Sequence, residues 1–314
     1  MTEERQVPEA SFGSYYGRPI LKVTRWREPH LPAYLFLGEL SGGTAVVGAA
    51  AAATGHPALA RAGRLVAAVA AFAGAGFLTA ELGRPERFGN MLRVAKPTSP
   101  MSVGSWALAA HSGLVTASAA SSVTGLLPGL GAAAGAASAV TGPVLAAYPG
   151  VLLANTAVPA WHSAYRELPL LFASGAMTAA AAAGLLAAAW PGSRANPGPA
   201  ARLALFGAVA ESVAGYGLEH RLGAAGEPYR VGSAGQVLRA ARAMTVAGGA
   251  CALAARRSRG AAALSGVLLA SGSLAAKFAV FRAGVASAKD PRYVVAQQRA
   301  AGGDAAAQAA PARA

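Results

Sequence analysis

Residues 33–54 read AYLFLGELSGGTAVVGAAAAAT, a stretch of 22 residues in which Glu39 is the one charged residue. About 20 apolar residues in a helix are enough to cross the hydrocarbon part of a bilayer. Seven more stretches of this kind follow. They cover 64–82, 103–127, 132–158, 168–190, 201–221, 236–255 and 260–281. The sequence therefore predicts an all-α integral membrane protein, a bundle of eight transmembrane helices with both termini on the same side.

The composition agrees with a membrane protein. Hydrophobic residues make up 54% of the chain and charged residues 13%, about half the usual charged share. The 39 glycines and many alanines suit membrane helices, because small residues let helix backbones approach closely. A disordered low-complexity chain is excluded, since the apolar runs are long and are separated by charged loops.

The net charge of +14 would suit a nucleic-acid-binding protein, but the 27 basic residues do not cluster on one stretch. They lie between the apolar runs, 18 of them on the side of the N-terminus and 7 on the opposite side. The positive-inside rule then places both termini in the cytoplasm of a multi-pass plasma-membrane protein. The longer loops are also on the N-terminal side, so we expect a partner protein to dock there.

Three regions are expected along the chain: a polar N-terminal arm over 1–32, the eight-helix transmembrane domain over 33–284, and a tail over 285–314. The arm lacks the apolar core of a cleavable signal peptide, and the tail is expected to be disordered after 302. The single cysteine, Cys251, excludes an internal disulfide, an iron–sulfur cluster and a CxxCH haem site. An integral haem would need facing pairs of axial histidines, and His111 alone of the five histidines lies well inside a span. We therefore expect no haem, metal or iron–sulfur cluster in this chain.

Ionisable groups inside membrane spans are costly and are candidates for function. Glu39, His111, Glu211 and Lys277 are the candidates for proton transfer. The alternative is an ion pair that only fixes helix packing, such as Glu211 with Lys277 or with Arg239. His111 alone could equally be a hydrogen-bonded packing residue.

The loop after the second span contains charged residues that could face a partner protein, and it ends in two serines that can cap the third helix. The charged residues are Arg84, Glu86, Arg87 and Arg93, and the serines are Ser99 and Ser102. A helix N-terminus attracts a carbonyl or an anion, and a quinone has two carbonyl oxygens. The alternative is a structured loop that binds lipid headgroups.

Aromatic and titratable side chains gather at the same side of the predicted bundle. They are Trp26, His30 and Tyr34 near the first span and Trp161, His162 and Tyr165 near the fourth. An interfacial belt explains the aromatic residues but not the histidines among them. A quinol site needs an apolar slot and groups that exchange protons, and this side of the first four spans offers both.

Several short motifs carry a resemblance to a known family. They are YLFLGELSGG at 34–43, ELGRPERF at 81–88, SPMSVGSW at 99–106, GVLLANTAVPAWH at 150–162, LPLLF at 168–172, FAVFRAG at 278–284 and DPRY at 290–293. In their order and spacing they resemble the NrfD / polysulfide reductase membrane subunits, and the last two resemble the actinobacterial-type branch. Glu39 stands where the family often has Gly or Ala, and Glu81 where it often has Asp.

The resemblance implies an eight-helix subunit without a redox cofactor of its own, which binds menaquinone or ubiquinone. It implies an iron–sulfur ferredoxin-like partner and, through it, a molybdopterin catalytic subunit. By the same resemblance, the quinone head lies near His30, Tyr34, Met101 and Ser102, with Tyr148 as a further proton donor. The chain alone is then not catalytic.

Two other hypotheses stay open. A secondary transporter or proton channel would use Glu39, Glu211 and Lys277, and Pro143 and Pro149 are expected to interrupt its fourth span. A passive membrane anchor of a redox complex would bind no quinone, but eight spans are more than an anchor needs.

Overall fold

A computed structural model describes residues 20–21, 24, 26–82 and 85–297. This part of the chain is helical and contains no strand. Its long helices are α1 (His30–Ala53), α2 (Pro57–Glu81), α3 (Pro100–Thr124), α4 (Pro128–Ala154), α6 (Glu167–Ala189), α7 (Pro197–His220), α9 (Gly232–Ala252) and α10 (Arg259–Lys289). Its short helices are η1 (Pro85–Leu92), α5 (Pro159–Ser163), η2 (Gly223–Gly226) and α8 (Glu227–Arg230). Each predicted span coincides with one long helix.

Five of the long helices, α1, α2, α4, α6 and α10, are long and apolar enough to cross a membrane. The other three, α3, α7 and α9, are as long as a span needs but more polar. α9, for example, carries Arg239 and Arg242. The all-helical membrane character is therefore confirmed, and the number of eight spans stays a prediction.

Some helix ends differ from the predicted ones, because a glycine ends one helix early and a proline begins the next. The sequence predicts the turn between the third and fourth helices at 127–131. It lies at 125–127, because Gly125 ends α3 in the left-handed conformation (φ 71°) and Pro128 begins α4. The expected interruption of the fourth span is also wrong, since α4 is one continuous helix with Pro143 and Pro149 inside it.

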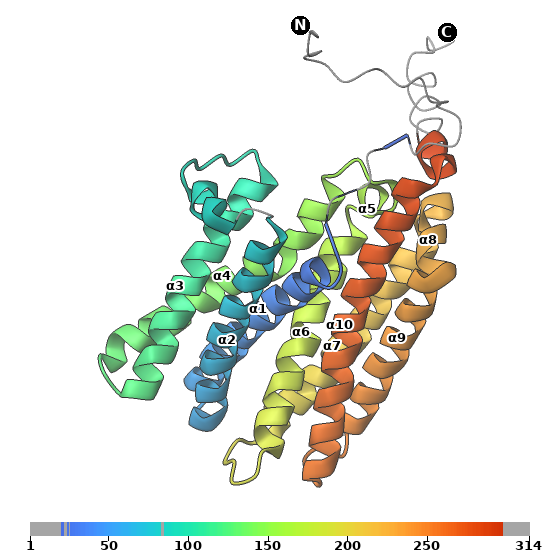
Figure 1. Ribbon diagram of the computed structural model, residues 1–314. Helices are drawn as coiled ribbons and strands as arrows, with labels where there is room; N and C mark the ends of the chain where they lie inside the picture. The colour runs from blue at the N-terminus through green and yellow to red at the C-terminus, as the bar shows by residue number, and fades with distance from the viewer. Residues whose placement is uncertain (1–19, 22–23, 25, 83–84, 298–314) are drawn as a thin grey trace, which may run out of the picture.

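The long helices form two groups of four that lie side by side (Figure 1). In the first group α1 packs on α2 and α4, and α3 packs on α2 and α4. In the second group α6 packs on α7 and α10, and α9 packs on the same two helices. α1 and α6 join the groups, because α1 also contacts α6 and α10.

Small residues let α1 approach its neighbours closely. A Cβ atom added to Gly42 would overlap the backbone carbonyl of Gly142 in α4, and one added to Gly43 would overlap the carbonyl of Ala176 in α6. Such close contacts hold helices together where lipid gives no hydrophobic drive for association. They also fix the position of Glu39, one helical turn before Gly42 and Gly43.

The helical part begins and ends at the same end of the molecule. The Arg282 guanidinium near the end of α10 pairs with Glu28 just before α1, with an Nε–Oε1 distance of 2.8 Å. The same end carries η1, α5 and α8 (Figure 1). We call it the η1 end and the opposite one the distal end.

Candidate functional site

Three ionisable side chains from three helices meet inside the bundle. Glu39 of α1, Glu211 of α7 and Lys277 of α10 are 0%, 5% and 0% exposed. Lys277 Nζ lies 2.9 Å from Glu39 Oε1 and 4.0 Å from Glu211 Oε1. We call these three residues the buried cluster. It joins the two helix groups, since Glu39 belongs to the first group and its partners belong to the second.

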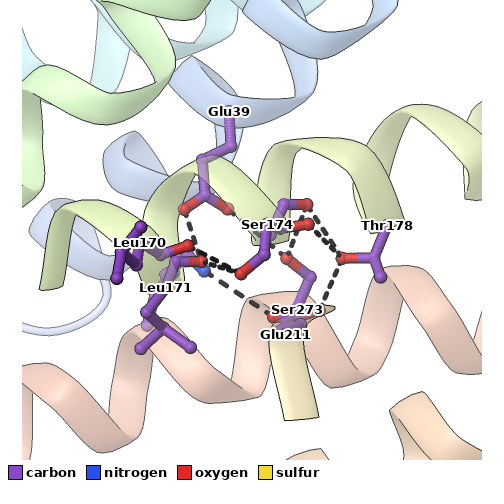
Figure 2. A network of polar contacts seen from close by, with 9 residues as sticks. Glu39, Leu170, Leu171, Ser174, Thr178, Glu211 and Ser273 are labelled. Atoms are coloured by element: carbon purple, nitrogen blue, oxygen red, sulfur yellow. Dashed lines mark hydrogen bonds and ion pairs between the residues drawn. The ribbon is translucent and has the colours of Figure 1, made fainter. Parts of the chain in front are cut away.

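Hydroxyl groups complete the surroundings of the carboxylates (Figure 2). Thr178 Oγ1 donates to Glu211 Oε2 at 2.5 Å, and Ser273 Oγ donates to Glu39 Oε2 at 3.4 Å. The Phe172 ring centroid lies 5.0 Å from Lys277 Nζ, within the range of a cation–π interaction.

A glycine makes room for the cluster. A Cβ atom on Gly175 of α6 would lie 2.7 Å from Lys277 Nζ and 2.8 Å from Glu39 Oε2. Any side chain at this position would displace the ion pair. Gly175 and Thr178 lie three residues apart and therefore share the face of α6 that meets the cluster.

The charges of the cluster do not balance when all three groups are ionised. Two carboxylates then face one ammonium group, and one negative charge stays uncompensated in an apolar interior, where it is expensive. A proton on either carboxyl removes the uncompensated negative charge. The cluster can therefore hold one proton on Glu39 or on Glu211, since both carboxyls lie near Lys277.

The predicted pairing of Glu211 with Lys277 is thus found, and Glu39 is the nearer partner. Arg239, the alternative, donates to the backbone carbonyl of Arg230 instead. The sequence did not indicate Gly175, Thr178 or Ser273 as neighbours of the cluster. One small or hydroxyl residue among many in an apolar span gives no signal of its own.

His111 lies apart from the cluster. It is fully buried, with Nε2 3.0 Å from Ser41 Oγ and Nδ1 2.9 Å from Thr141 Oγ1. Ser41 gives its own proton to the carbonyl of Ala67 at 2.7 Å, so it accepts from His111 Nε2. Ser41 is two residues from Glu39 and therefore faces the other side of α1. His111 thus links α1, α3 and α4 through hydrogen bonds, and its role in proton transfer stays a prediction.

A second group of polar side chains lies at the η1 end, on the first helix group. The hydroxyls of Tyr34 in α1 and Tyr148 in α4 are 3.4 Å apart. Tyr34 is 3% exposed, and the Tyr148 ring occupies the space where Gly104 of α3 lacks a side chain. Three helices thus hold this tyrosine pair in the interior.

His30 lies one turn before Tyr34, at the start of α1. Its Nδ1 is 3.7 Å from Glu81 Oε2 at the end of α2, and Glu81 Oε1 accepts from the backbone N–H of Arg27 at 2.8 Å. The edge of the Phe77 ring packs against His30, with a centroid distance of 6.1 Å. His30 Nδ1 and Glu81 Oε2 are both buried and lack an aligned hydrogen bond among the described residues.

Next to this group an apolar cavity of about 200 Å³ separates α2, η1 and α3. It is lined by Phe72, Ala75, Leu78, Phe88, Met91, Leu92, Ser105, Leu108, Ala109 and Ser112. Two of its wall residues adjoin the polar group along the chain: Ser105 follows Gly104, which the Tyr148 ring covers, and Leu78 follows Phe77, which packs on His30. The cavity thus neighbours the polar group, although His30, Tyr34, Glu81 and Tyr148 do not line it.

The comparison with known proteins decides the family. Residues 24–210 match the family model described as polysulphide reductase, NrfD. The chain belongs to the NrfD family. No curated protein matches it. The match runs from the residues before α1 to Ala210 in α7, so it includes His30, Tyr34 and Tyr148 and ends one residue before Glu211.

NrfD proteins are quinone-interacting membrane subunits of oxidoreductase complexes that also contain iron–sulfur and molybdopterin subunits. The likeness of residues 278–293 to the actinobacterial-type branch lies beyond the matched residues and stays a prediction. In the described residues no group of three His, Cys, Asp or Glu side chains is arranged to hold a metal ion.

The remaining predicted residues of the NrfD site lie around the third helix and its loop. Met101 is 54% exposed. Ser99 caps α3, as expected, and the Ser102 hydroxyl donates to the carbonyl of Val94 at 3.0 Å and accepts from the N–H of Lys96 at 2.9 Å. Ser102 thus closes the loop, and a contact of Met101 or Ser102 with quinone stays a prediction.

Of the predicted partner-facing residues, Glu86 and Arg93 are exposed at the η1 end. Arg84 lies outside the described residues, and so does the side chain of Arg87.

Proposed function

We propose that this chain is the membrane subunit that passes electrons between an iron–sulfur partner and menaquinone or ubiquinone at the η1 end. The observation that carries the proposal is the convergence of His30, Glu81, Tyr34 and Tyr148 beside an apolar slot. Membership of the NrfD family supports it independently.

The residues present fit a quinone. A quinone has an apolar ring and tail with polar carbonyls at opposite edges, so its site needs an apolar slot and hydrogen-bond donors. The cavity between α2, η1 and α3 offers apolar walls. The unbonded atoms His30 Nδ1 and Glu81 Oε2 and the paired hydroxyls of Tyr34 and Tyr148 offer polar partners.

A bound quinone supplies the redox chemistry, in which it takes up or releases a proton with each electron. The chain's own groups bind it and move those protons. One tyrosine hydroxyl of the pair donates to the other, which leaves a donor directed away from the pair. His30 and Glu81 lie close enough to exchange a proton directly or through one water. Arg27 N–H holds the Glu81 carboxylate in place.

The partner proteins belong to this proposal as well. The η1 end carries the exposed Glu86 and Arg93 and is the natural docking face for an iron–sulfur subunit, because the quinone residues lie just beneath it. We place this end on the cytoplasmic side of the plasma membrane on the distribution of basic residues, with eight spans and both termini on that side.

The buried cluster supports a proton-coupled role for Glu39, Glu211 and Lys277. It also supports the second candidate function, a proton channel or secondary transporter, because charges at the middle of a bundle mark ion pathways. The quinone hypothesis is favoured because the chain belongs to the NrfD family, whose members are quinone-interacting membrane subunits.

Quinone turnover by the purified complex tests the proposal. Tyr34→Phe removes one hydroxyl of the pair and keeps the ring. We expect quinone turnover to fall about tenfold or more, because a proton donor is lost, while the complex still assembles. Tyr216→Phe is the matched control, because Tyr216 is 58% exposed on α7. Equal turnover of both variants would refute the role of the tyrosine pair.

A further inference from the structure

A small cavity adjoins the buried cluster on one side. It has a volume of about 20 Å³ and lies between α6, α7, α9 and α10. Its lining residues are Leu171, Glu211, Ser212, Gly215, Leu238, Ala241, Arg242, Thr245 and Ala276. A cavity of this size has room for one water, provided that two or more polar groups face it.

Polar groups of this kind are present. Glu211 Oε1 is buried and makes no aligned hydrogen bond, and its residue lines the cavity. Arg242 and Thr245 of α9 lie on another wall of the cavity. A water here can therefore bond to the Glu211 carboxyl and to at least one donor from α9.

The cavity leads toward the η1 end. Side chains of a helix tilt toward its N-terminus, and α9 begins at the η1 end. The Arg242 guanidinium accordingly reaches Glu219, one residue before the end of α7, with an Nη2–Oε1 distance of 2.7 Å. The side chains are 30% and 9% exposed, so this pair lies between water and the cavity.

The walls next to the cluster on its distal side are apolar. A cavity of about 960 Å³ opens toward the distal end. Its lining near the cluster is Phe36, Leu40 and Ala270, whereas its polar residues, Arg61 and Ser193, belong to the start of α2 and the connection after α6.

The space between the distal halves of α6, α7, α9 and α10 is filled by alanines and leucines, among them Ala204, Ala208 and Leu269. Ser265 lies in this region but gives its proton to the carbonyl of Gly248 at 2.6 Å. The cavity of about 330 Å³ between α1, α4, α6 and α7 is lined by apolar side chains and glycines alone, and such a cavity stays dry.

We propose that the buried cluster is a proton-binding site that exchanges its proton with water only at the η1 end, through the cavity between Glu211 and Arg242. The inference concerns a site other than the quinone site and does not depend on quinone binding. It makes the cluster a one-sided proton store and not a path across the membrane.

The charged and polar groups that face the cluster agree with this role. α1 contributes Glu39, α10 contributes Lys277 and Ser273, and α6 contributes Thr178. α9 contributes Arg242 across the cavity, and α7 itself contributes Glu219. Arg242 keeps its charge at every physiological pH, so it orients the water and the Glu219 carboxylate but does not carry the proton.

The proton step needs no electron. On uptake, an O–H bond of the cavity water breaks as an O–H bond forms on Glu211, and the water regains a proton from the η1 end. Lys277 then gives one of its protons to Glu39 as it takes one from Glu211. Every proton that enters the cluster is held on a carboxyl or on the ammonium group.

Infrared difference spectroscopy on the full chain in sided proteoliposomes tests the proposal. The probe is a pH jump applied to one side at a time, and the signal is the carboxylic C=O band that disappears in Glu211→Gln or Glu39→Gln. We expect the band to follow the pH of the η1 side alone. A band that follows the distal side, both sides or neither side would overturn the proposal, and so would the absence of a protonated-carboxyl band.

Variants of the cavity make the test specific. Ala241→Val fills the space for the water without touching a charge, and we expect the response to slow about tenfold or more. Ala243→Val, on the exposed face of the same helix, is the control and should respond as wild type. Thr245→Val removes a hydroxyl at nearly constant volume and should also slow the response. Unchanged rates in both cavity variants would contradict the proposed route.

Discussion

Replacing Lys277 by Met should destabilise the protein severely. The change keeps a long side chain but removes the ammonium group that lies 2.9 Å from Glu39 and 4.0 Å from Glu211. Both carboxyls then lack a counter-charge in a fully buried place. Breaking a buried ion pair by removing one partner costs about 3–5 kcal/mol.

The expected loss can be followed as thermal unfolding of the full chain in mild detergent. A cost of this size lowers the melting temperature by about 10 °C for a domain of a few hundred residues. Lys289→Met is the matched control, because Lys289 is exposed at the end of α10, and it should leave the melting temperature within about 1–2 °C of wild type.

The double variant Glu39→Gln with Lys277→Met shows whether the loss of stability comes from the broken ion pair or from changed side-chain packing. With Glu39 neutral, Glu211 is the one carboxyl left, and it keeps its hydrogen bond from Thr178. We therefore expect the double variant to regain about half of the loss or more, since the two changes are coupled through one contact. Additive losses, or a single variant as stable as Lys289→Met, would refute the assignment of the cluster as a coupled charged site.

Further predictions follow from other contacts. Gly42→Ala places a methyl group against the Gly142 carbonyl and should lower the free energy of unfolding in detergent by about 1–3 kcal/mol. Gly76→Ala is the control, because a Cβ atom there meets no atom within 4 Å, and it should leave the free energy of unfolding unchanged or raise it by up to ~1 kcal/mol. Equal effects of the two changes would contradict the close contact of α1 and α4. Glu81→Gln should raise the KM for quinol more than it lowers kcat, because it weakens the hold on His30, and an unchanged KM would remove Glu81 from the site. Burial, with Glu167 nearby, raises the pKa of Tyr229, whose hydroxyl donates to Ala160 O at 3.1 Å. The unfolded chain loses this proton near pH 10, so the stabilisation is complete below that pH and is lost as the pH rises above it. Tyr229→Phe should flatten the fall of stability between about pH 9 and 11, and an equally steep fall would refute the assignment.

The sequence predicts the helices well because each span is a local pattern of apolar residues. It also predicts that Glu39, Glu211 and Lys277 are special, because a charge in an apolar run stands out. It does not predict the contact between Glu39 and Lys277, since 238 positions separate them and helix packing alone brings them together. Gly175 and Thr178 are ordinary residues in an apolar helix, and only the structure shows that they border the cluster.

At the η1 end the sequence indicates His30, Tyr34 and Tyr148 by resemblance to the family, and their binding of quinone stays a prediction. The structure brings the two tyrosine hydroxyls within 3.4 Å and places His30 one turn before Tyr34. Glu81 was noted as a motif residue, but its pairing with His30 depends on where α2 ends. Ser102 was predicted near the quinone, yet its hydroxyl is used to close the loop before α3, a role that a lone serine does not reveal in sequence.

The most direct test of the central claim is a mild-detergent purification of the tagged full chain, with mass spectrometry of the co-purified proteins and extracted lipids. We predict that an iron–sulfur subunit, a molybdopterin subunit and a bound quinone co-purify with the chain. The amount of bound quinone should fall in Tyr34→Phe and stay unchanged in Tyr216→Phe. Recovery of the chain without such partners and without quinone would contradict the account.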